Sequence, residues 1–119
     1  MTIRHEVLVG IADYLNRMSN IIYKLSRKSF ISRRDEEAYR DLVINYFSLA
    51  CLLLKRKDAK RIKELIDKNF DNLDKDVWTK ILLEISIALN KSMQKILVVL
   101  DESGEERITY FDELEVEEE

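Results

Sequence analysis

The chain has 119 residues, of which 46% are hydrophobic and 36% are charged, enough for one folded domain with its own core. It contains no proline and only two glycines, so few residues suit tight turns, and long helices are favoured over a many-stranded barrel or sandwich. The single cysteine, Cys51, excludes an intramolecular disulfide and therefore excludes small secreted proteins that disulfides hold together. No apolar run approaches ~18 residues and no signal peptide opens the chain, so we expect a cytoplasmic protein without a membrane span.

The net charge of −3 conceals a division along the chain. Residues 1–100 carry 19 Lys and Arg against 13 Asp and Glu, whereas residues 101–119 carry one Arg against ten acidic residues. This asymmetry predicts a folded domain over 1–100 and an acidic C-terminal tail over 101–119. Lys, Glu, Arg, Ile and Leu dominate while Gln occurs once, a balance typical of proteins from thermophiles.

The first predicted element is an amphipathic helix over 3–28. Its apolar residues recur at alternating steps of four and three, which places them on one face of a helix. We also expect Gly10, inside this helix, to let a neighbouring backbone come close. The apolar stripe consists of Val7, Ile11, Tyr14, Met18, Ile21 and Leu25, widened by Leu8, Leu15 and Ile22.

The second predicted helix begins after Ser32 and runs to about Lys55. Ser32 stands three residues before Asp35, a spacing suited to capping a helix start. Between Phe47 and Leu54 the helix is apolar almost all round, so it is either central in a bundle or covered by a partner chain. We expect Cys51 to be a buried thiol within this run. Core spacing also predicts that Tyr23, Tyr39, Tyr46 and Phe47 pack inside the protein.

A third and a fourth helix follow after short connections. Asp58 is the predicted cap of the third helix, and either Asp71 or Asp74 caps the fourth. Trp78 opens the fourth helix, where it either packs in the core or anchors a partner. Because the connections are short, we expect successive helices to pack antiparallel. The predicted fold is therefore all-α, an antiparallel bundle of about four helices.

The helical pattern fades after residue 95. KILVVL is rich in β-branched residues, RITYF alternates, and DESGEE lies between them, which favours a short β-hairpin. The alternative extends the fourth helix to Leu100 and leaves the rest irregular, because an isolated hairpin is marginally stable in water.

The residues needed for catalysis are scarce. His5 is the only histidine, and we expect a surface position for it, because no nucleophile or orienting group accompanies it. One Cys and one His argue against a zinc site of the usual kind, and two distant glycines cannot form a phosphate-binding loop. We therefore expect no enzyme activity, no metal or other cofactor, and no small-molecule substrate.

Two basic clusters lie on either side of the second helix. The first basic cluster consists of Lys24, Arg27, Lys28, Arg33 and Arg34; the second consists of Lys55, Arg56, Lys57, Lys60, Arg61 and Lys63. A helix of ~22 residues would hold them ~30 Å apart, a span that could follow nucleic-acid phosphates. The alternative is that they are solvated helix ends. The candidate phosphate contacts are Lys28, Arg33, Arg34, Lys55, Arg56, Lys57, Lys60 and Arg61.

Three roles compete for the acidic tail. It is a solubilising flank, or it folds back and masks the basic clusters, or it binds a basic surface of another protein. Tyr110, Phe111 and Leu114 argue against pure solvation, because solvation gains nothing from apolar anchors. The acidic residues that would regulate through charge are Asp112, Glu113, Glu115, Glu117, Glu118 and Glu119.

A small proline-free body rich in Lys, Glu and Ile, followed by ITYFDELEVEEE, resembles the acidic-tailed accessory subunit of crenarchaeal replicative family-B DNA polymerases. The resemblance covers the whole architecture and rests on length, composition and tail. It implies a non-catalytic subunit whose helical body docks on the polymerase catalytic subunit. It also implies that the acidic tail lowers strand-displacement synthesis during DNA replication. The sequence departs from a featureless acidic tail at Ile108, Tyr110, Phe111 and Leu114.

Two other functions stay open. The basic clusters are also consistent with a helical nucleic-acid-binding subunit, such as the small scaffolding subunits of CRISPR effector complexes. The apolar run from Phe47 to Leu54 would also suit a structural protein that associates with a second copy of itself. The first alternative requires tight, salt-sensitive binding of nucleic acid by the isolated chain.

Overall fold

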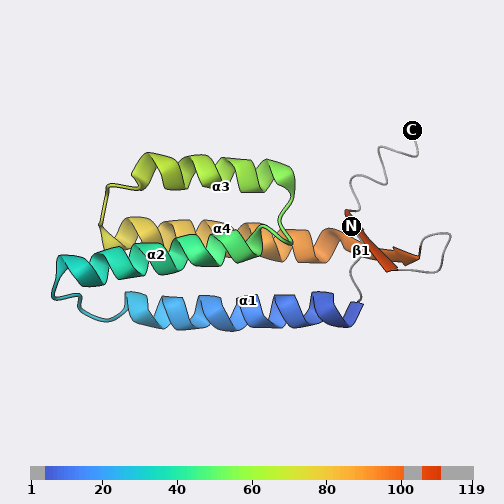
Figure 1. Ribbon diagram of the computed structural model, residues 1–119, viewed down its shortest axis with the longest axis horizontal. Helices are drawn as coiled ribbons and strands as arrows, with labels where there is room; N and C mark the ends of the chain where they lie inside the picture. Colours follow the sequence, from blue (N-terminus) through green and yellow to red (C-terminus); the bar gives the residue numbers. More distant parts are fainter. Residues whose placement is uncertain (1–4, 101–105, 111–119) are drawn as a thin grey trace.

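The computed structural model describes the backbone of residues 5–100 and 106–110, and the side chains of residue 7 and of residues 10–92. Four helices make up most of the described part, which confirms the predicted helical bundle (Figure 1). They are α1 (His5–Ser26), α2 (Arg33–Ala50), α3 (Arg56–Asn69) and α4 (Lys75–Lys95).

The last helix, α4, is the centre of the bundle and packs against each of the other three. The helices alternate in direction, so α1 and α2 form an antiparallel pair while α2 and α4 run the same way (Figure 1). The expectation that each helix packs on the next holds for α1 with α2 and for α3 with α4, but is corrected for α2, which packs mainly on α4 and α1 rather than on α3. The narrow apolar stripe of α3 explains this, because only Ile62 and Ile66 are buried on α3, enough for one neighbour.

One continuous core lies between the four described helices. Trp78 is fully buried there, so it is a core residue and its indole donates a hydrogen bond to the carbonyl oxygen of Asn72. Tyr23, whose spacing predicts a core position, is instead 40% exposed, with the Arg27 guanidinium over its ring. The buried core residues are Leu15, Ile22, Tyr39, Val43, Tyr46, Phe47, Ala50, Leu53, Leu54, Ile62, Ile66, Trp78, Ile81, Leu82, Ile85, Ala88 and Leu89.

Helix α1 turns a different part of its apolar stripe towards the core than predicted. Leu15 and Ile22 are buried, whereas Val7, Tyr14 and Ile21 lie at the edge of the stripe and are exposed. The stripe is wider than the surface that α2 and α4 cover, so its margin stays in solvent. The expectation for Gly10 is also wrong, because a Cβ atom there would meet open space.

Capping side chains explain two of the helix starts. The Ser32 hydroxyl accepts a hydrogen bond from the backbone N–H of Asp35, and the Asp74 carboxylate accepts one from the N–H of Asp76, so both predicted caps are confirmed. Asp58 is instead inside the first turn of α3, where its charge suits the helix dipole. Helix α2 ends at Ala50 rather than near Lys55, because a turn over 51–54 redirects the chain.

Two tyrosines spaced seven residues apart join α2 to α4. The Tyr39 hydroxyl lies 2.7 Å from Thr79 Oγ1, and the Tyr46 hydroxyl lies 3.5 Å from Ser86 Oγ. Thr79 and Ser86 donate their own protons to carbonyl oxygens one turn earlier, so the tyrosines are the donors. Because both partners advance by seven residues, the pairs form two rungs between parallel helices.

After α4 the chain forms two antiparallel strands, β1 (Ile96–Leu100) and β2 (Glu106–Tyr110). Their register places Ile96 opposite Tyr110, so β2 brings the backbone back to the end of α4. The regulatory acidic residues and the anchors Phe111 and Leu114 lie outside the described residues, and so does the side chain of Tyr110.

Candidate binding surfaces

The two basic clusters occupy opposite ends of the bundle, as the sequence predicts. The first surrounds the α1–α2 connection and the second surrounds the α2–α3 connection (Figure 1). Helix α2 lies between them and has 18 residues, which corresponds to about 27 Å at 1.5 Å per residue.

Lys75, from the start of α4, joins the first basic cluster. Its ammonium donates to the carbonyl oxygen of Lys28 at 3.1 Å and lies 5.2 Å from the centre of the Phe30 ring. Within the cluster, Arg33 pairs with Glu37 at 3.5 Å. The amino-acid sequence does not predict that Lys75 belongs to this cluster, because Lys75 and Lys28 are 47 residues apart and only the fold brings them together.

The second basic cluster is partly neutralised by carboxylates. Arg61 pairs with Glu84 of α4 at 3.0 Å and lies 3.9 Å from Asp58, and Lys63 pairs with Asp67 at 3.2 Å. Three of the other side chains, Arg56, Lys57 and Lys60, are exposed and make no ion pair with any described residue.

The start of α3 adds to the positive potential of the second cluster. Lys55 is the N-cap and its side chain makes no capping hydrogen bond. The first turn of a helix carries partial positive charge from its unpaired N–H groups, and Arg56 and Lys57 stand on that turn. This end of the molecule is therefore suited to an anion.

An apolar strip runs along the junction of α1 and α2, here called the α1–α2 seam: Val7, Tyr14, Ile21, Leu42 and Leu49. Its α1 members are between 50% and 60% exposed. Residues seven apart share one side of a helix, so the α1 members form a row, as do Leu42 and Leu49. Leu25, one turn after Ile21 on α1, and Leu42 line one depression between the helices, so the two helices meet beside Leu42.

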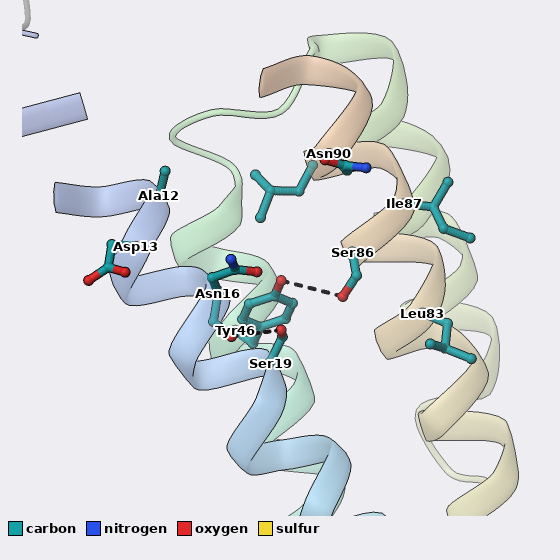
Figure 2. A pocket seen from close by; sticks show the side chains of 10 residues that line it. Ala12, Asp13, Asn16, Ser19, Tyr46, Leu83, Ser86, Ile87 and Asn90 are labelled. Carbon is teal, nitrogen blue, oxygen red and sulfur yellow. Dashed lines mark hydrogen bonds between the residues drawn. The ribbon is translucent and has the colours of Figure 1, made fainter. Parts of the chain in front are cut away.

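A groove of about 650 Å³ separates α1 from α4 on another side of the bundle. Figure 2 shows Tyr46 of α2 reaching between these helices, with its hydroxyl towards Ser86. The groove has a mixed lining, because amides and hydroxyls outnumber its large apolar side chains. Its walls are Ala12, Asp13, Asn16, Ser19, Leu83, Ser86, Ile87, Leu89 and Asn90.

The described residues offer little for catalysis. No three His, Cys, Asp or Glu side chains among them come close enough to hold a metal ion. Cys51 is exposed rather than buried, because α2 ends beside it. Neighbouring atoms nevertheless shield the thiol enough to raise its pKa, which makes the reactive thiolate scarcer. The side chain of His5 lies outside the described residues.

Within the described part of the chain, no helix has both the length and the apolar character needed to cross a membrane. Comparisons of the chain with family models, with curated proteins and with solved structures found no match. The candidate surfaces therefore rest on their geometry and charge alone.

Proposed function

We propose that this protein is a non-catalytic accessory subunit that docks on another protein through the α1–α2 seam. The exposed row of Val7, Tyr14 and Ile21 supports this proposal most directly. Contiguous apolar side chains on a surface are typical of a binding site, and an aromatic residue near the centre is a common anchor. The α1–α4 groove is a weaker candidate, because amides and hydroxyls interrupt its apolar lining.

The proposed partner is the catalytic subunit of a replicative family-B DNA polymerase. This part of the proposal comes from the resemblance of the body and of the tail ITYFDELEVEEE to the accessory subunits of such enzymes. The charge division supports it, since a tail of high negative charge can compete with DNA phosphates for basic polymerase surface. The tail would then restrain strand-displacement synthesis while the helical body holds the complex together.

Titration calorimetry with a purified polymerase catalytic subunit tests the docking. The seam variant Ile21→Gln/Leu49→Gln removes two apolar contacts, and we expect it to weaken binding by about tenfold or more. Leu83→Gln/Ile87→Gln on α4 is the matched control, because these side chains are 45% and 54% exposed. If both variants lose the same affinity for the polymerase subunit, neither face is the specific docking site. If only the control variant loses affinity, the docking site is on α4 and not on the α1–α2 seam.

A primer-extension assay across a downstream duplex tests the role of the tail. Replacing the tail carboxylates with amides from residue 112 to residue 119 should raise strand displacement while polymerase binding stays unchanged. If strand displacement does not rise, the tail has another task. If light scattering shows that the isolated chain is a dimer and the seam variant a monomer, a second copy covers the seam instead.

Direct nucleic-acid binding is the second candidate. It is favoured by five of the candidate phosphate contacts, which are exposed and make no ion pair with described residues: Lys28, Arg34, Arg56, Lys57 and Lys60. Tight binding of the isolated chain to a single-stranded oligonucleotide, weakening steeply with salt, would support it. Negligible binding at low salt, both by the intact chain and by the variant whose tail carboxylates are amides, would exclude it.

A further inference from the structure

We propose that the acidic tail of this chain docks on its own second basic cluster, at Arg56, Lys57 and Lys60. The proposal concerns the isolated chain and does not depend on the polymerase partner. The last described residue, Tyr110, stands opposite Ile96, the first residue after α4. The last part of the tail, residues 111–119, therefore follows from the α4 end of the hairpin, on the same end of the bundle as the start of α3 (Figure 1).

The distances along the helices place the second cluster within reach. Helices α3 and α4 run antiparallel, and the ion pair between Arg61 and Glu84 sets them level at those residues. Arg56 is then level with about residue 89, and the end of α4 at Lys95 lies about 9 Å further along the axis. The helix-to-helix spacing adds roughly 10 Å. Nine residues follow Tyr110 and can extend to about 30 Å, which covers this separation with chain to spare.

The first basic cluster is a much poorer target for the same segment. It lies beside Lys75 at the opposite end of α4, and 21 helical residues correspond to about 31 Å. Residues 111–119, fully extended, span about 30 Å and would only just arrive there, so their carboxylates could not settle among these cations. Helix geometry therefore selects the second cluster, although both clusters are basic.

Charge makes the contact favourable. The tail holds six carboxylates from Asp112 to Glu119, and Arg56, Lys57 and Lys60 offer exposed cations without ion pairs among the described residues. The positive end of the α3 dipole acts in the same direction. A short tether gives a millimolar effective concentration, so weak exposed ion pairs suffice for occupancy at low salt. The tail would thus shield this cluster from other polyanions.

Cys51 provides a direct test in the full-length chain. It is the only cysteine, it is exposed, and it stands on the turn that leads into α3. A nitroxide attached there should broaden the amide NMR signals of residues 112–119 at low salt. We expect most of this broadening to disappear in about 1 M salt, where the Debye length is about 3 Å.

Two matched variants decide the site. Arg56→Gln/Lys57→Gln/Lys60→Gln should abolish the salt-sensitive broadening, and the Arg61–Glu84 ion pair stays intact because neither partner is changed. Lys28→Gln/Arg33→Gln/Arg34→Gln removes equal charge at the other end and should leave the broadening as it is. Circular dichroism verifies that both variants fold. Equal broadening in all three proteins, its absence in the unmodified chain, or its loss only in the Lys28 variant would overturn the proposal.

Discussion

Removing one hydroxyl, with Tyr39→Phe, should destabilise the fold by about 1 kcal/mol. The Tyr39 hydroxyl donates a 2.7 Å hydrogen bond to Thr79, and the residue is 2% exposed. Phenylalanine keeps the edge-to-face contact with Phe30, in which the ring centres are 5.3 Å apart. Thr79 still donates to the carbonyl oxygen of Lys75, so no buried donor is stranded. The loss is therefore close to that of one neutral hydrogen bond.

Urea and thermal unfolding measure this loss. With an unfolding entropy of about 2.1 cal/mol/K per residue, 1 kcal/mol lowers Tm by roughly 4–5 °C in a chain of this size. Tyr46→Phe is the control, because its hydroxyl is 3.5 Å from Ser86, beyond good hydrogen-bond length, and removing it should cost less than half as much. If the two variants lose the same free energy of unfolding, or if Tyr39→Phe loses none, the Tyr39–Thr79 hydrogen bond is not the stronger of the two.

Three further outcomes are expected. Gly10→Ala should stabilise the protein by about 0.5–1 kcal/mol, since a Cβ there meets open space; a lower Tm would contradict this. Ser92→Ala should be neutral or stabilising by up to about 1 kcal/mol, because the buried hydroxyl has no partner among the described residues, and clear destabilisation in urea would reveal one. Burial raises the pKa of Tyr39 above 10.0, so its neutral form favours the folded state. Stability should therefore fall as pH rises above about 10, more steeply than in Tyr39→Phe, and parallel pH profiles would exclude this.

The helical architecture is predictable because local signals agree with one another. The Ser32 and Asp74 caps, the absence of proline and the 3.6-residue periodicity all indicate helices, and the structure has them. Which part of a wide apolar stripe is covered is not predictable in this way. The apolar pattern of α1 is consistent with burial of either Tyr14 or Leu15. The positions of α2 and α4 bury Leu15 and leave Tyr14 in solvent.

The candidate surfaces also have parts that the amino-acid sequence predicts and parts that depend on tertiary packing. Basic residues that are adjacent in the chain, such as Arg56 and Lys57, form a cluster that the amino-acid sequence alone reveals. The arrival of Lys75 beside Lys28 depends on tertiary packing and leaves no local pattern. The prediction for Cys51 is wrong for a related reason: its apolar neighbours favour burial, but a turn instead of a continued helix follows Ala50.

The central position of α4 has a consequence for the order in which the protein can fold during synthesis. Of the four described helices, the one that contacts all the others is synthesised last. Until it emerges, the nascent chain holds the apolar sides of α1 and α2 without Trp78, Ile81 and Ile85, which complete the core. Translation must therefore pass residue 95 before the body can close, and chains that stop before α4 will expose apolar surface that favours aggregation or binding by chaperones.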